Sequence, residues 1–182
     1  MAERLKQMPC PHCNVVGTLI RHGFLRGYDD ANPQHKTVRA RRLFCSNRNA
    51  RRGCGRTISV WVATKIRRLG LNTGALWRFL QHAVAGSILA AVHASESRLS
   101  ERTWQRIWRR FRMGQCKIRT ALFTRHPPPD PPPGQPPPGQ PTPGQSPHRP
   151  AQAQVLAHLQ AAFPNADCPI AAFQQAMRTF FI

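Results

Sequence analysis

Four cysteines in the first third of the chain constrain its fold more than any other feature. Cys10 and Cys13 form a C-x2-C pair, and Cys45 and Cys54 follow after sequence that alternates between strand-like runs and turns. Two cysteine pairs separated in this way are typical of a tetrahedral site in which four thiolates hold one zinc ion, Zn2+. A region of about 50 residues buries little apolar surface, so we expect the metal to supply much of its folding free energy.

The second cysteine pair departs from the usual spacing, because eight residues separate Cys45 from Cys54. We interpret residues 46–53 as a basic insertion that loops out and leaves both thiols within reach of the metal. A C-x2-C pair also occurs in redox motifs, but no βαβ pattern of a thioredoxin-like fold surrounds this one. Three histidines are candidate substitutes for a cysteine, although we expect each to be a plain surface residue: His12, His22 and His35. We expect the two remaining cysteines, Cys116 and Cys168, to be packed or incidental thiols.

The charge of the chain favours a polyanionic partner. The sequence holds 27 Lys and Arg against 7 Asp and Glu, a formal net charge of +20, and residues 1–126 carry 25 of these basic and 5 of the acidic side chains. These positive charges repel one another in the folded protein, and binding a polyanion such as nucleic acid reduces this repulsion. A base-composition bias can explain why Arg outnumbers Lys, but it does not explain the scarcity of acids.

The same scarcity argues against several classes of function. Metal-dependent nucleases and strand-transfer enzymes use several converging carboxylates, and the seven acids here are scattered. The longest apolar stretch, residues 83–94, is shorter than the about 20 residues that span a bilayer, and residues 1–8 do not form a secretory signal. We therefore expect a cytoplasmic, nucleoid-associated protein with reduced cysteines and no membrane partner.

Hydrophobic periodicity divides the chain into four regions. Residues 9–62 contain three predicted strands, at 15–21, 38–44 and 57–62, separated by glycines read as turns. Residues 72–125 have helical periodicity, with a first helix capped by Asn72 or Thr73, a second at 87–94 and a third capped by Ser100. Residues 127–150 hold 13 of the 18 prolines and predict an extended, disordered linker. Residues 151–182 predict two short helices, at 151–163 and 169–181, in a tail that must dock on the basic domain, a second copy or another protein.

The third helix carries two opposite faces. Its apolar arc is formed by Trp104, Ile107, Trp108 and Phe111, and we expect this arc to pack on the first helix and on Leu89 and Val92 of the second. The opposite arc presents guanidinium groups that fit phosphates and guanine edges. Three helices in this order match a helix-turn-helix whose third helix enters the major groove, although a solvated basic face on an ordinary bundle gives the same pattern.

Several segments together resemble the N-terminal region of insertion-sequence transposases and of their accessory DNA-binding proteins. They read C-P-H-C at 10–13, I-R-H-G-F-L-R at 20–26, R-R-L-F-C at 41–45, C-G-R-T at 54–57 and L-S-E-R-T-W-Q-R-I-W-R-R-F at 99–111. The resemblance covers residues 9–125 and implies a small α+β fold, with a β zinc ribbon followed by a three-helix helix-turn-helix. It implies metal-ligand roles for Cys10, Cys13, Cys45 and Cys54. The chain departs from the family in the basic insertion and in lacking a catalytic domain.

We therefore expect a zinc-dependent protein that binds double-stranded DNA, is related to transposition of a mobile element, and does not carry strand-transfer chemistry itself. A zinc-ribbon transcription regulator and a fragment or subunit of an active transposase are the alternatives, and a homodimer or a separate catalytic subunit is a possible partner. The expected phosphate contacts are Arg39, Arg41, Arg42, Arg48, Arg51 and Arg52. The expected contacts from the third helix are Arg102, Thr103, Arg106 and Arg109, with Arg110 at their flank.

Overall fold

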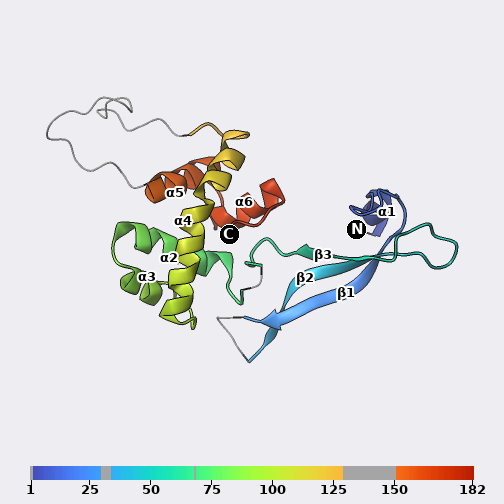
Figure 1. Cartoon of the computed structure of the whole chain (residues 1–182), viewed down its shortest axis with the longest axis horizontal. Coiled ribbons are helices and arrows are strands. Elements are labelled where there is room, and N and C mark those ends of the chain that lie inside the picture. The colour runs from blue at the N-terminus through green and yellow to red at the C-terminus, as the bar shows by residue number, and fades with distance from the viewer. Residues whose placement is uncertain (1, 30–33, 68, 129–150) are drawn as a thin grey trace. The chain divides into compact units, whose positions relative to one another are not determined.

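The chain is a small α+β protein made of two compact units, Met1–Gly70 and Leu71–Ile182 (Figure 1). The computed structural model describes residues 2–29, 34–67, 69–128 and 151–182. Most of the predicted linker, at 127–150, therefore lies outside the described residues. Among the described helices, none combines the length and the apolar character that crossing a membrane requires.

The first unit is built on a three-stranded antiparallel sheet in the order β1-β2-β3. It contains α1 (Ala2–Gln7), β1 (Leu19–Tyr28), β2 (Lys36–Cys45) and β3 (Thr57–Trp61). The second and third strands lie where the sequence predicts them. The first strand was placed too early, at 15–21, because residues 15–18 belong to the first cysteine loop, where Val16 forms a bridge with Pro9. Gly23, read as a turn, lies inside β1 at a register shift and has a φ of +91°.

The buried cluster at the cysteine loops is small and consists largely of cysteine. Cys10, Leu19 and Cys45 are buried together, and Cys13 and Ile58 pack against them. Few apolar side chains are thus available to hold the two cysteine loops against the strands. The arrangement explains why a unit of this composition needs a further source of stability.

The second unit begins with three helices, of which the first and third start at a predicted cap. They are α2 (Thr73–Ala85), α3 (Ile88–Ala94) and α4 (Glu101–Phe123). Asn72 Oδ1 accepts a hydrogen bond from the Ala75 N–H at 2.7 Å, and Ser87 and Ser100 accept equivalent bonds at the starts of α3 and α4. Local capping signals therefore located the starts of α2 and α4, and the structure adds Ser87 as the cap of α3.

Aromatic rings form the core between α2 and α4. Trp104 stacks on Phe79 with ring centroids 4.2 Å apart, and Trp108 meets Phe79 edge-on at 6.4 Å. The expected packing of the apolar arc on α2 is therefore confirmed. The expected contribution of Leu89 was wrong, since its side chain is 55% exposed. Ala91 is the buried residue of α3, and a residue two positions away on a helix faces nearly the opposite side.

The C-terminal tail forms part of this helical unit. Its helices α5 (Ala151–Ala162) and α6 (Pro169–Met177) both contact α2, and α5 also contacts α4. Phe173 is buried, and Phe181 stacks on Phe111 of α4 at 5.9 Å. Helix α6 ends four residues earlier than predicted, because Arg178 adopts a left-handed conformation with φ +51°.

Removing a tail side chain should therefore destabilise the helical unit. Phe173→Ala is expected to lower the free energy of unfolding by about 3–5 kcal/mol, the usual cost of deleting a buried phenylalanine. Chemical denaturation followed by circular dichroism measures the change. Phe123→Ala is the matched control, since Phe123 is 53% exposed and its loss should cost much less. Equal unfolding midpoints for the two variants would contradict docking of the tail.

Candidate metal centre

The first cysteine loop is closed by its own backbone hydrogen bonds. The Cys10 N–H donates to the Val15 carbonyl at 3.0 Å, and the Asn14 N–H donates to the Cys10 carbonyl at 2.8 Å. Asn14 has a φ of +57°, a conformation that Asn tolerates better than most residues. This tight turn brings the thiols of Cys10 and Cys13 to the same side of the loop.

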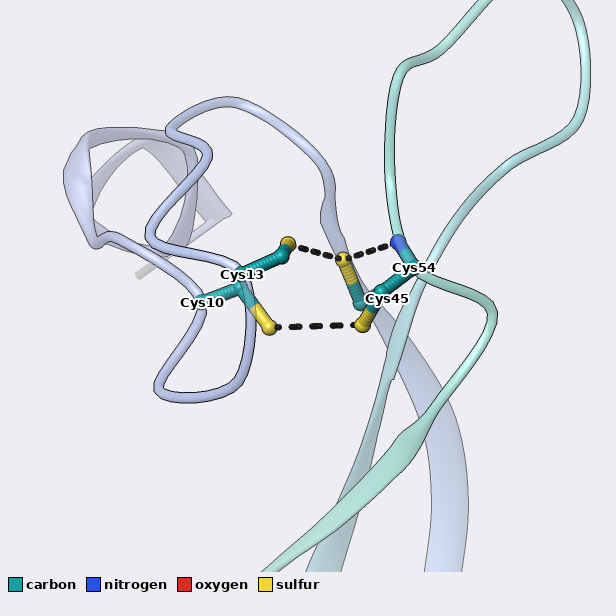
Figure 2. Close-up of side chains that lie close together, drawn as sticks. All are labelled: Cys10, Cys13, Cys45 and Cys54. Atoms are coloured by element: carbon teal, nitrogen blue, oxygen red, sulfur yellow. Dashed lines mark hydrogen bonds between the residues drawn. The ribbon is translucent and has the colours of Figure 1, made fainter.

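Backbone hydrogen bonds also close the loop between Cys45 and Cys54 at its base. Cys45 ends β2, and Gly55 N–H donates to its carbonyl at 2.9 Å. Gly53 N–H donates to the Ser46 carbonyl at 3.1 Å, so the two ends of the loop formed by residues 47–52 lie next to each other. Figure 2 shows the resulting loop beside Cys54. The insertion therefore loops out as expected, and both thiols reach one site.

The four sulfur atoms lie close together and face a common centre (Figure 2). All four are within 4.8 Å of one another, with Cys10 Sγ 3.8 Å from Cys54 Sγ and Cys13 Sγ 3.7 Å from Cys45 Sγ. A tetrahedron with metal–sulfur bonds of about 2.3 Å has sulfur–sulfur edges of about 3.8 Å. The arrangement can hold one metal ion and is compatible with a single zinc.

Hydrogen bonds to the sulfurs make the environment of the thiols unequal. The Thr18 hydroxyl lies 3.1 Å from Cys45 Sγ, and the Cys54 N–H donates to the same sulfur at 3.2 Å. The Thr18 contact is the main reason that the pKa of Cys45 is lowered to about 6, and the Cys54 N–H adds to it. A hydrogen bond from the Val15 backbone lowers the pKa of Cys13, but desolvation and the neighbouring thiols together raise it to about 11.

Thr18 is a supporting residue that sequence reasoning missed. It is a buried polar side chain, 4% exposed, immediately before β1. Such a group typically orients a metal ligand from outside the coordination shell. A threonine ahead of a strand is too common in sequence to reveal this role, because it depends on Cys45, which is 27 residues away.

Among the described residues, the four cysteines form the single group of three or more metal-capable side chains. The three candidate histidines are exposed, as expected for surface residues: His12, His22 and His35. Cys116 is exposed rather than packed, and Cys168 is half-buried just before α6.

The arginines expected to contact DNA differ in the solvent exposure of their side chains. Those on the outer face of α4 and on the insertion loop are exposed: Arg48, Arg51, Arg52, Arg102, Arg106, Arg109 and Arg110. Arg41 is exposed on β2, whereas Arg39 and Arg42 are half-buried. Arg39 also donates to the Tyr28 carbonyl and is partly engaged within the sheet. Thr103 is half-buried beside the cap of α4, with its hydroxyl 3.0 Å from that of Ser100.

Comparisons of this chain with protein-family models, with curated proteins and with solved structures found no match.

We expect one metal ion per chain in the purified protein. Cys45→Ser should abolish stoichiometric binding, because the remaining three thiolates no longer complete the tetrahedron. Elemental analysis of the dialysed protein measures the metal content. Cys116→Ser is the matched control, since this exposed thiol lies on α4, and it should retain one ion per chain. Equal metal content in the two variants would contradict the four-cysteine site.

The loop between Cys45 and Cys54 should not accommodate a side chain in place of Gly53. A Cβ there would lie 2.2 Å from the Ser46 carbonyl oxygen, inside any allowed contact. Gly53→Ala is therefore expected to weaken metal binding by at least about tenfold, in the range seen when the surroundings of metal ligands are disturbed. Competition with a chromogenic chelator measures the affinity. Gly114→Ala, where a Cβ meets no atom within 4 Å, should leave the affinity unchanged.

Proposed function

We propose that this chain is a zinc-dependent protein that binds double-stranded DNA, related to the DNA-binding regions of insertion-sequence transposases. In this proposal the cysteine loops and β1–β3 act as a zinc ribbon. Helices α2, α3 and α4 act as a helix-turn-helix, with α4 in the major groove. The chain binds DNA at element ends or at its own promoter and leaves strand transfer to a separate catalytic partner.

Zinc is the metal that best suits the donor set. Four thiolates at tetrahedral spacing favour zinc over the hard cations, which prefer oxygen ligands. The metal has a structural role here, since four protein ligands leave no open position for a substrate.

The observation that carries the proposal is the division of α4 into a buried and a charged face. Trp104, Ile107 and Phe111 are buried in the helical core. The arginines on the other side of the helix are exposed and have no carboxylate partner within the described part of the chain: Arg102, Arg106, Arg109 and Arg110. A helix held by one face, with arginines on the other, suits insertion into the major groove, where Arg binds guanine bidentately.

The excess positive charge supports the same partner. Ion pairs join Lys65 to Asp29 and Arg78 to Glu96, and they engage two of the seven acids in the sequence. Because the sequence has 27 basic side chains and only 7 acidic ones, most of its positive charge cannot be neutralised within the chain. The exposed insertion arginines lie next to the proposed zinc site. Backbone hydrogen bonds close their loop at its base and limit its conformational freedom.

Binding to duplex DNA should weaken steeply as salt rises. Each phosphate contact contributes a slope of about −0.9 to the logarithm of the association constant against the logarithm of the salt concentration. Titrating labelled genomic fragments at several salt concentrations measures the total slope. An affinity that does not change with salt would refute the proposal.

Arg106→Ala should reduce affinity for a preferred site by about 1–3 kcal/mol, as expected for a residue that contacts a base edge. The comparison of the selected site with random duplex DNA measures the loss. Arg178→Ala removes the same charge from the tail and should have little effect on sequence preference. An equal loss on random DNA would make Arg106 a phosphate contact instead of a base contact.

A further inference from the structure

One face of the sheet exposes large side chains that the proposed duplex-binding helix does not use. Phe24 is 55% exposed, Tyr28 is 54% exposed and Val60 is 50% exposed. Two of them are aromatic rings on the same strand, β1. Exposed aromatic residues gathered on one element are uncommon in a soluble protein without a binding role.

Strand pairing places these residues on a common face. Phe24 pairs with Arg41, and Arg41 pairs with Val60, so the three form one row across the sheet. The next rows toward the far end of β1 pair Arg26 with Val38 and Tyr28 with Lys36. The register shift between Leu25 and Arg26 puts its extra residue in β2, so every second residue of β1 from Phe24 to Tyr28 keeps facing the same way.

Cations alternate with the aromatic rings on this face. Three cationic side chains on this face are exposed. Arg26 lies between the two rings on β1, Arg41 pairs with Phe24, and Lys36 pairs with Tyr28. Lys36 Nζ lies over the Tyr28 ring, 5.3 Å from its centroid, so a positive charge occupies one face of that ring. The nearby carboxylate of Asp29 is paired with Lys65, which reduces its repulsion of an anion.

From this pattern we propose that the aromatic face of the sheet, defined by Phe24, Arg26, Tyr28, Lys36 and Arg41, binds an unpaired nucleic-acid strand. Bases stack on Phe24 and on the face of Tyr28 that Lys36 does not cover, and the three cations bind the phosphates between them. The rings are four residues apart on β1, a separation of about 13 Å along the strand. A paired duplex does not suit this surface, because its bases are stacked on one another and offer no free faces to the rings.

This site goes beyond the duplex-binding function and does not rest on it. The base contacts of the duplex proposal come from α4, whereas the aromatic face belongs to the other unit of the chain, and Arg41 is the one residue expected to contact phosphates in both proposals. Charge decides against the other occupants of an exposed apolar face. A row of cations between the rings favours a polyanion over an apolar protein surface, because covering a charge with apolar groups removes its water without supplying an opposite charge.

The test is the binding of full-length protein to fluorescein-labelled oligothymidylate, oligouridylate and a hairpin duplex, measured by anisotropy at fixed salt. Phe24→Ala and Tyr28→Ala should each weaken binding to the single strands by about five- to 150-fold, the range for loss of one stacked base. Binding to the duplex should change less than twofold. The two single-stranded probes distinguish DNA from RNA as the preferred strand.

Controls separate stacking from folding. Phe24→Trp should restore single-strand affinity, since any aromatic face can stack, and metal content should stay at one ion per chain in every variant. Phe123→Ala removes a phenylalanine of similar exposure from α4 and should leave single-strand binding unchanged. Arg106→Ala should lower duplex affinity and spare single-strand affinity.

Three results would overturn the inference. The first is unchanged single-strand affinity in Phe24→Ala and Tyr28→Ala. The second is an equal loss for single strands and duplex, which would indicate general charge contacts. The third is loss of self-association or vesicle binding in these variants without any effect on single strands, which would assign the face to a second copy or a lipid surface. Failure of the duplex proposal appears separately, as a duplex affinity that does not depend on salt.

Discussion

The convergence of four sulfur atoms is the constraint on which the first unit depends. One buried cluster of this unit holds Cys10, Leu19 and Cys45, with Cys13 and Ile58 packed against them, so three of its five residues are candidate metal ligands. One bound ion would link two loops that are 44 residues apart in sequence, from Cys10 to Cys54. In a unit this small, coordination of that ion would take the place that side-chain packing holds in larger domains. The strands are then free to expose both charge and aromatic rings.

The helical unit is stabilised in the opposite way, by aromatic packing. Phe79, Trp104 and Phe111 form a dense core, and the C-terminal tail adds Phe173 and Phe181 to it. This packing fixes one face of α4 and leaves its arginines in solvent. A helix that is held by its apolar face keeps its backbone conformation when a ligand contacts the opposite face, which reduces the entropic cost of binding. The two units thus offer different surfaces, a guanidinium row on a helix and a mixed aromatic and cationic face on a sheet.

Features encoded by neighbouring residues were predictable from the sequence. Asn72, Ser87 and Ser100 begin helices because each offers a side-chain acceptor to a nearby N–H group. The two buried faces of α2 and α4 followed from periodicity, and the four-cysteine cluster followed from residue type and spacing. Strand positions were less accurate, since Gly23 reads locally as a turn but occupies a bulge within β1.

The sequence by itself determined which four cysteines form the candidate metal site, the helix starts and the sign of the charge, because residue type, spacing and contacts a few residues apart decide these properties. Only the tertiary structure decided that Thr18 supports Cys45, that the tail packs on α2, and that Phe24 and Tyr28 share a face with cations of β2. Each of these depends on pairing between distant segments. A one-residue change of register would move the same rings to the other side of the sheet, so no local pattern could have placed them.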